Sequence, residues 1–538
     1  MWWTVHCPLR PCVFASLRLV IAATPLLAQD PLARRWDHVI LHHDALRYDV
    51  MLSLPDTGAL IHAAVTARWR LNGSGPVVLD LDSALTVRRV TVNGAAAPWR
   101  REPNRVVIPV TGRPGDTVTT EVRYDGRPTD GLVLRGEGAG RTVFADNWPD
   151  RARHWLATQD YPGDKAAVRW TVEAPAGYSV VANGRLEGAD TLPGGRVRWR
   201  FVNPEPVPTY TMVVGMARSA ATALPPAQCA VRCVPVSVVT YPADSAFAAD
   251  GPFRRAGEIV DFFSARIAPF PYAELRHVES STIFGGMENA TAIFYDEKGY
   301  RERRTSESTV AHETAHQWFG DAVTEADWHH LWLSEGFASY GAALWAEHVG
   351  GDSALRAEMR EAKAAIAASP ATERPILDSS VTDRMLLLNA NNYQKGAWTL
   401  HTLRGLIGDS AFFTGLARYY RTYAHRNALS SDFARVMSEA AHQELGWFFR
   451  QALTQPGYPV LAVATELEGG HLLVTIRQVQ KPSWGTYRMP NLELRLDDRI
   501  LGVDVEGRVT RVATHWESDR PPAVVEVDPK GWWMVERR

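Results

Sequence analysis

The sequence HETAH occupies residues 312–316, and LWLSEGFASYGAALW follows it at residues 331–345. On a helix, His312 and His316 project from one face, so both imidazoles can bind one metal ion. Neutral imidazole suits Zn²⁺, which takes three protein ligands at a catalytic site and keeps one position open. Glu335 is the predicted third ligand, because the eighteen residues between it and His316 allow a second helix to return alongside the first.

This ligand set predicts hydrolytic chemistry at the metal. Zinc on two histidines and one carboxylate lowers the pKa of bound water to about 7. Glu313 leans away from the two histidines and is suitably placed to hold that water. The pattern HExxH alone also arises by chance on helix faces, and the carboxylate on a second helical pattern is what favours a metal site.

The other histidines that stand out are not predicted to bind the metal. His329 and His330 fall in the predicted turn between the two helices, where a solvated or packing role is favoured over ligation. The same interpretation applies to His42, His43 and His348.

Hydrophobic periodicity divides the chain into three parts. From about residue 47 to 214, apolar and polar residues alternate between turn signals, which predicts an antiparallel β domain. Helical spacing dominates residues 253–453, and alternating strands return after Pro456. The predicted fold is α+β and multidomain, with a β domain over residues 29–222, a mainly helical domain over 223–455 and a small C-terminal β-sandwich over 456–538.

Composition excludes several classes of protein. The 538 residues are 46% hydrophobic and 22% charged, which is enough to build large cores. Lys+Arg 58 against Asp+Glu 60 gives a formal net charge of -2, which argues against a nucleic-acid-binding protein. No stretch reaches the roughly 18 uncharged apolar residues that span a bilayer, so no integral membrane span is predicted. The sequence leaves the oligomeric state open.

Residues 1–28 are predicted to be a secretory signal peptide. The first 29 residues contain no Asp or Glu, carry Arg10 and Arg18, and include an apolar run at 19–27 before Ala28. The protein is therefore predicted to be exported, to the periplasm or outside the cell. A wrongly assigned start codon and an acid-poor transit peptide are competing explanations.

Two cysteines remain after that segment, Cys229 and Cys233 in the stretch CAVRC. In an exported protein such a pair can close a small disulfide loop, and otherwise the two would be reduced thiols. Without a further Cys or His pair they make a poor metal site.

A glycine pair precedes the metal motif in FGGMENA, residues 284–290. Gly285 and Gly286 permit a close backbone approach, as when an edge segment pairs with an extended peptide. Glu288 follows and could face an ammonium group. A Gly-Gly turn before a surface glutamate explains the segment equally well.

Taken together, these motifs resemble the zinc aminopeptidases of the aminopeptidase N type. HETAHQWFGDAVT is similar to the family's HExxHQWFGNLVT, with Asp321 in place of Asn, and WLSEGFA is similar to WLNEGFA, with Ser334 in place of Asn. NYQKGAWTLHTLRGLIG contains the family's Y-x-K-G-A segment, in which the tyrosine is Tyr393. The likeness extends over roughly residues 40–460.

The resemblance implies a thermolysin-like catalytic domain with one Zn²⁺ per chain on His312, His316 and Glu335. It also implies that Glu313 acts as general base and then acid, and that Tyr393 stabilises the transition state. The implied substrate contacts are Gly285, Gly286, Met287, Glu288 and Asn289. In that family the glutamate of this segment binds the free amino terminus of a peptide.

The sequence departs from the family at three places. Gly286 replaces the commoner alanine of GAMEN, and the family's glutamine in the N-terminal domain has no clear match, with Asp146 and Asn147 as candidates. Only about eighty residues follow Pro456, where many members add a large helical domain. The resemblance therefore implies a three-domain form with a more open site.

The predicted function is a zinc-dependent aminopeptidase that acts on peptides with a free N-terminus. A secreted zinc endopeptidase shares the metal motif, but it would not favour the buried charge of Glu288. Two further hypotheses are an epoxide hydrolase of a related branch and a non-catalytic binding protein that keeps this fold.

Overall fold

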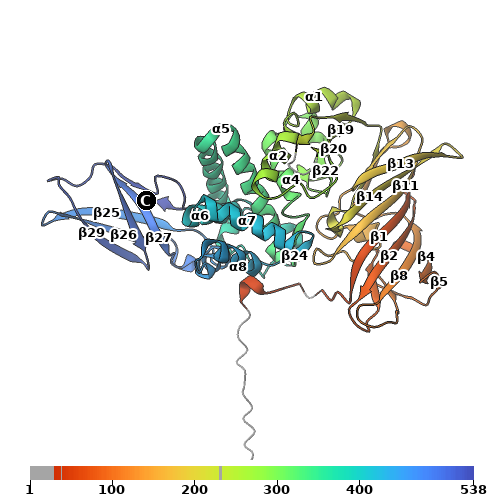
Figure 1. The fold of residues 1–538 in the computed structure, drawn as a ribbon, viewed down its shortest axis with the longest axis horizontal. Helices are drawn as coiled ribbons and strands as arrows, with labels where there is room; N and C mark the ends of the chain where they lie inside the picture. Colours follow the sequence, from red (N-terminus) through yellow and green to blue (C-terminus); the bar gives the residue numbers. More distant parts are fainter. Residues whose placement is uncertain (1–29, 38, 229–232) are drawn as a thin grey trace, which may run out of the picture.

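The computed structural model describes residues 30–37, 39–228 and 233–538, which form three successive parts (Figure 1). In this view the N-terminal β domain lies on the right, the helical middle domain in the centre and the C-terminal β domain on the left. The predicted signal peptide lies outside the described residues, as does Cys229 of the predicted disulfide. None of the helices in the described ranges is long and apolar enough to cross a bilayer.

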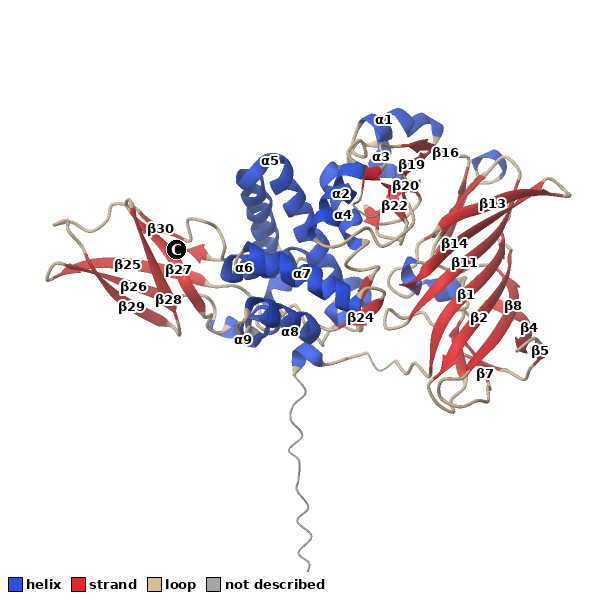
Figure 2. Ribbon diagram, viewed as in Figure 1, coloured by secondary structure: helices blue, strands red, loops and turns tan. Residues whose placement is uncertain are grey.

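An eight-stranded sheet forms most of the N-terminal domain (Figure 2). Along β2 every second side chain is buried, as the period-two pattern predicts. In sheet order its strands are β13 (Arg185–Leu192), β14 (Arg196–Pro208), β11 (Lys165–Pro175), β1 (His43–Ser53), β2 (Ile61–Leu71), β8 (Thr117–Gly126), β4 (Leu85–Val92) and β5 (Ala95–Ala96). The strands pair antiparallel as predicted, except that β1 and β11 pair in parallel. The alternation of apolar and polar residues identifies the buried face of a strand, but it does not identify the strand that pairs with it.

Two smaller sheets complete this domain. One has the order β12 (Ser179–Ala182), β15 (Val214–Ala217), β10 (Thr142–Ala145) and β9 (Leu132–Arg135). The other has the order β3 (Val77–Asp80), β7 (Arg105–Ile108) and β6 (Arg100–Glu102).

A five-stranded sheet that the sequence did not reveal opens the middle domain. Its order is β16 (Ala220–Ala223), β19 (Val236–Thr240), β20 (Leu275–Ser280), β22 (Ala292–Asp296) and β21 (Gly286–Met287). The predicted domain boundary after residue 222 falls inside β16, which pairs with β19 and so belongs to the middle domain. A separate short pair, β17 (Ala227–Gln228) and β18 (Cys233–Val234), lies on either side in sequence of residues 229–232, which are outside the described residues.

Helices make up the rest of the middle domain (Figure 2). They are α1 (Ser245–Asp250), α2 (Ala256–Arg266), α3 (Glu297–Arg301), α4 (Glu307–His316), α5 (Trp332–Ala368), α6 (Gly396–Ile407), α7 (Asp409–Tyr423), α8 (Ser430–Ala441) and α9 (Gly446–Thr454). A parallel pair, β23 (Val323–Glu325) and β24 (Arg426–Ala428), links the turn after α4 to the turn after α7.

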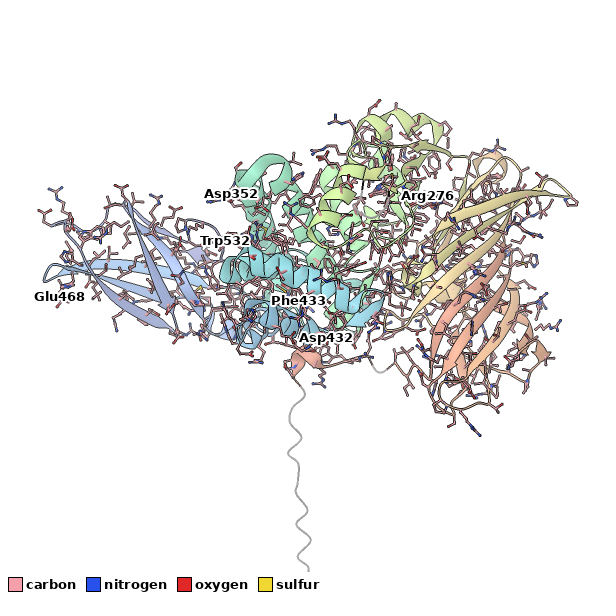
Figure 3. All side chains as sticks on the ribbon, in the orientation of Figure 1. Arg276, Asp352, Asp432, Phe433, Glu468 and Trp532 are labelled. Carbon is pink, nitrogen blue, oxygen red and sulfur yellow. The ribbon has the colours of Figure 1, made fainter. Side chains whose placement is uncertain are left out.

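Helix α5 consists of two helical segments. Gly351 has φ 71° and ψ −170°, a conformation that glycine adopts readily and that breaks the helical path. Asp352, next to this break, lies at the outer tip of the helix (Figure 3). Residues on both sides of the break line one cavity, so the second segment runs beside the first.

The C-terminal domain is a small two-sheet unit, as predicted. One sheet has the order β29 (Val509–His515), β26 (His471–Gln478), β25 (Val460–Glu468) and β31 (Glu536–Arg537). The second has the order β28 (Arg499–Val505), β27 (Met489–Leu496) and β30 (Val525–Val527). Leu472 and Val474 of the first sheet share one hydrophobic core with Leu494 of the second, which makes the unit a sandwich.

The segment before β1 lies against the middle domain rather than the β domain. The turn η1 (Pro31–Ala33) contacts α8 and α9. The backbone N–H groups of Trp36 and Asp37 donate to Asp327 at 2.8 and 2.7 Å. The predicted start of the β domain at residue 29 is therefore too early.

Candidate active site

The HETAH sequence forms the last part of α4, whose start is defined by a cap. The Ser306 hydroxyl accepts a hydrogen bond from the Thr309 N–H at 3.1 Å, and Glu307 lies in the first turn, where a negative charge is favourable. The predicted second helix is α5, and Glu335 lies in its first turn. Gly341 allows the close approach, because a Cβ at that position would collide with Ala315 of α4.

The three predicted ligand atoms converge on one point. The Nε2 atoms of His312 and His316 are 3.1 Å apart, and Glu335 Oε2 lies 3.4 and 3.3 Å from them. Ligands about 2.0–2.1 Å from a tetrahedral zinc are about 3.3 Å from each other, so these separations match zinc ligation. Glu335 Oε2 is buried and accepts no hydrogen bond from the described residues, which leaves it available for a cation.

His316 is held in the orientation that ligation requires. Its Nδ1 lies 3.1 Å from the carbonyl oxygen of Phe319 and 3.1 Å from Ser334 Oγ. A proton on Nδ1 donated to that carbonyl leaves the lone pair on Nε2 for the metal. Gly320, with φ 129°, makes room for this arrangement, since a Cβ there would collide with Ser334.

Buried carboxylates surround the two imidazoles. An oxygen of Glu288, an oxygen of Glu313 and a ring nitrogen of His316 lie within 4.8 Å of one another. Burial would lower the pKa of His316, but these carboxylates and Glu335 raise it above its ordinary value. The site therefore favours a positive charge at His316, as expected beside a metal ligand set, whereas burial lowers the pKa of His312.

Glu313 lies beside the metal ligands and against the glycine pair. Burial is the main cause that raises the pKa of Glu313 well above its ordinary value. A Cβ on Gly286 would collide with the Glu313 carboxylate. The glycine in place of the family's alanine is therefore the residue that fits this carboxylate position.

The glycine segment is the edge of the five-stranded sheet. Strand β21 pairs with β22 through Gly286 and Met287, and no other described strand pairs with it. Gln317 fixes the following backbone to the end of α4: its Nε2 donates to Glu288 O at 3.0 Å, and its Oε1 accepts from the Thr291 N–H at 2.9 Å. The residue after HETAH thus sets the distance between this segment and the zinc ligands.

Glu288 is only 5% exposed. Burial raises the pKa of Glu288, and a hydrogen bond from the Tyr210 hydroxyl counteracts part of that rise. Tyr210 belongs to the short turn η4 (Thr209–Thr211) of the N-terminal domain. The sequence pattern contained no signal for it, because an isolated tyrosine at the end of a strand is typical of a β-domain core.

One cavity of about 200 Å³ contains the predicted centre. Its lining residues are Trp148, Phe284, Gly285, Gly286, Met287, Glu288, His312, Glu313, His316, Glu335, Leu388 and Tyr393. Of the predicted substrate contacts only Asn289 is missing, since it is fully buried below the segment. Trp148, Phe284 and Leu388 were not predicted, and they make one wall apolar.

Tyr393 reaches the cavity from a π-helical turn, η9 (Asn391–Lys395). Its ring stacks on His312, with centroids 6.0 Å apart and an angle of 5°. Burial, and next the Glu335 carboxylate, raise the pKa of Tyr393 well above its ordinary value, so its hydroxyl stays protonated and can donate a hydrogen bond. Short π-helical turns are common where a functional side chain must be aimed.

Neither candidate for the family's N-terminal glutamine lines this cavity. Asn147 donates to Met212 O at 2.7 Å and accepts from Trp155 Nε1 at 2.8 Å, so its amide serves the domain core. Asp146 accepts from the Ile283 N–H at 3.1 Å and from Thr282 Oγ1 at 3.3 Å. Asp146 therefore anchors the loop that leads into the glycine segment.

His329 and His330 have packing roles and are buried rather than solvated. Their rings lie 5.5 and 5.2 Å from the ring of Trp36. Asp37, Asp327 and His329 are close enough to hold a metal ion, but both carboxylate oxygens of Asp327 already accept hydrogen bonds from Trp36, Asp37 and His329.

Comparisons with known proteins agree with this site. Residues 255–451 match the Peptidase family M1 domain. Aminopeptidase N from Streptomyces lividans is 27% identical over 479 residues, which are 82% of this chain and 53% of that protein. The chain spans about half the length of the curated relatives it matches.

Two solved structures share the fold. The M1 zinc metallopeptidase from Deinococcus radiodurans is 26% identical, with a TM-score of 0.70 over 78% of this chain and 95% of that one. Legionella pneumophila aminopeptidase A in complex with aspartic acid is 18% identical, with a TM-score of 0.81 over 94% of this chain and 61% of that one. The second likeness concerns the fold alone.

The fold and the ligand set are similar to those of zinc metallopeptidases. Within the middle domain, residues 255–451 match the Peptidase family M1 domain, and His312, His316 and Glu335 fit a zinc ion.

Proposed function

We propose that this protein is a zinc-dependent aminopeptidase that removes the N-terminal residue from peptides. One observation carries the proposal: buried Glu288 lies within 4.8 Å of Glu313 and His316. A substrate ammonium bound by Glu288 would place the first peptide bond, and no later one, beside the reacting groups. Buried carboxylates need a charged partner, so a free amino terminus binds better than a blocked one.

Different residues of the active site carry out different parts of the hydrolysis. His312, His316 and Glu335 hold the zinc ion, which, when bound, polarises the scissile carbonyl and makes water a stronger acid. Glu313 takes a proton from the attacking water and gives it to the leaving amine. The Tyr393 hydroxyl donates to the oxygen that becomes negative in the transition state.

The edge strand β21 aligns the substrate. An extended peptide can add to its open edge through backbone hydrogen bonds, and Gly285 and Gly286 let the two backbones approach closely. A mutant of the Deinococcus radiodurans enzyme has been solved with a bound Tyr-Ser-Ala substrate, which supports peptides as the substrate class.

Export of the protein is part of the proposal. It rests on the acid-free, apolar N-terminal segment of the sequence, with cleavage near Ala28. N-terminal sequencing of protein recovered from the medium and from cell fractions would test it. Recovery only inside the cell with Met1 retained would contradict export.

A pair of matched peptides tests the aminopeptidase assignment. The purified, zinc-loaded protein should remove the first residue from a free peptide and leave its N-acetylated copy intact. Glu288→Ala should lower kcat/KM for the free peptide by a hundredfold or more, because the ammonium loses its buried partner. Cleavage of both peptides at equal rates, or internal cleavage of an N-blocked protein, would instead indicate an endopeptidase.

A further inference from the structure

A second cavity, of about 450 Å³, adjoins the metal centre. We call it the α5 cavity. It is lined by Ser308, Thr309, His312, Ser339, Ala342, Ala343, Glu358, Met359, Glu361, Ala362, Ala365, Gln394 and Ala397. The residues come from α4, from both segments of α5 and from the turn that leads into α6. The break at Gly351 creates the cavity, because it turns the second segment of α5 back beside the first.

The α5 cavity meets the active site at the zinc ligands. His312 lines both cavities, and on the adjacent wall Tyr393 lines the active-site cavity while Gln394 lines the α5 cavity. Glu288 lines only the active-site cavity. A peptide whose amino terminus lies at Glu288 must continue away from Glu288 after the bond that is cut, and the α5 cavity is the space that adjoins the ligands there.

The charged groups of the α5 cavity are acidic. Apart from His312, its only ionisable lining residues are Glu358 and Glu361. Neither forms an ion pair with another residue in the part of the chain that the structure describes. Glu358 and Glu361 line the same cavity. Burial, and next the charge of Glu361, raise the pKa of Glu358. Small alanines make up much of the remaining wall and leave room for a long side chain.

We propose that the α5 cavity binds a cationic side chain of the substrate through Glu358 and Glu361, so that peptides with Lys or Arg directly after the removed residue are preferred. This inference rests on the proposed function and adds a preference for the substrate residue that directly follows the cleaved bond. Glu358 is half-buried and Glu361 is exposed, so the expected preference is modest, about three- to tenfold. It should shrink as the salt concentration rises, because solvent ions screen such pairs.

Amidated tetrapeptides Leu-Xaa-Gly-Gly provide the test, with lysine or norleucine as Xaa. Norleucine matches the lysine stem without its charge, and the amide removes a carboxylate that the cavity would repel. Two quantities are measured: kcat/KM with the zinc-loaded protein, and Kd with the Glu313→Gln protein, which needs no turnover. Lysine is expected to be favoured three- to tenfold over norleucine in both.

The double variant Glu358→Gln/Glu361→Gln should bring both ratios close to one. Glu468→Gln is the matched control, since Glu468 lies at the far tip of the C-terminal domain and its loss should leave the ratios unchanged (Figure 3). Equal values for lysine and norleucine in the wild type would overturn the inference, as would a lysine preference that survives the double variant. If no free peptide is cleaved, the aminopeptidase proposal fails, while the Kd ratio still decides the charge preference of the cavity.

Discussion

At the scale of single residues, the proposed chemistry depends on three neighbouring carboxylates of the active site that have different roles. Glu335 faces two imidazoles and is the ligand, whereas Glu313 is offset from the ligand set and keeps a raised pKa. Glu288 comes from a different segment and forms no ion pair with a lysine or arginine among the described residues, so it can bind the substrate ammonium. Three glutamates thus take three roles because their neighbours differ.

Glu313→Gln is expected to lower kcat by about 10²–10⁴-fold, the usual contribution of a general base. The side chain keeps its size, and the three ligand atoms are untouched, so the zinc content should stay at one per chain. Steady-state kinetics and metal analysis on the same sample check both statements. Near-normal turnover would mean that Glu313 is not the general base. Loss of zinc would mean that Glu313 also contributes to metal binding.

Gly286→Ala tests the fit between the glycine segment and the general base. The new methyl group would meet the Glu313 carboxylate, which lies at the end of a flexible side chain and can move aside. We therefore expect normal folding and zinc content but a kcat lowered by about tenfold, since a small misplacement of a catalytic group is costly. Gly73→Ala is the control, because Gly73 lies in the β domain outside the active-site cavity and a Cβ there meets nothing within 4 Å. Equal kcat values for the two variants would refute the argument.

At the scale of elements, the sequence predicted α4 and the start of α5 well. Spaced histidines and a distal carboxylate are local signals, and the structure contains both as predicted. The five-stranded sheet was missed, because its central strands β19, β20 and β22 are short, buried on both faces and mixed with helices, so they show no alternation. Tyr210 and Trp148 were missed for another reason: they reach the site from a different domain, and only the packing of two domains brings them there.

The buried core of that sheet makes stability depend on pH. Burial lowers the pKa of His277, in β20, to about 3, so it stays neutral in the folded protein while the unfolded chain binds a proton below about pH 6.5. Its contribution to stability is therefore present above pH 6.5 and is lost as the pH falls. Between pH 7.5 and 5.0 this single group should cost about 2 kcal/mol of unfolding free energy.

His277→Phe removes the titration and keeps an aromatic ring beside Tyr295. The difference in unfolding free energy between pH 7.5 and 5.0 should be smaller in the variant than in the wild type by about 2 kcal/mol. Denaturant unfolding at the two pH values measures it, and all other titrating groups cancel in the comparison. An unchanged difference would show that His277 is protonated equally in both states.

At the scale of the whole molecule, the active site depends on how the β domain sits against the middle domain. Tyr210 and Trp148 belong to the first domain, and the zinc ligands to the second. The three-domain form that the sequence implied is present, yet its first boundary lies before Ala220 and its N-terminal segment is held by Asp327. Alternation of apolar and polar residues cannot locate the boundary between the two domains, because a strand shows the same pattern whether it pairs with a sheet of the first domain or of the middle domain.

Lys165 links these two domains through several hydrogen bonds. It begins β11, is 8% exposed, and its Nζ donates to Asp321 O and Ala322 O at 2.7 Å each and to Thr324 Oγ1 at 2.9 Å. These acceptors belong to the turn after α4, which Gln317 connects to Glu288 through a bond to Asp321 at 2.7 Å. One ammonium group thus fixes the β domain next to the amine-binding carboxylate.

Lys165→Met keeps the apolar stem and leaves the buried oxygens without their donor. The unfolding free energy should fall by about 2–4 kcal/mol. KM for a free peptide should rise by a larger factor than kcat falls, because the substitution weakens the positioning of the amine-binding site and leaves the catalytic groups unchanged. Lys481→Met is the control: Lys481 pairs with Glu373 at the surface, where its side chain is 60% exposed, and its loss should change stability by less than about 0.5 kcal/mol. If both variants are equally stable and equally active, the β domain is held by its apolar contacts alone, and the position of Glu288 does not depend on this lysine.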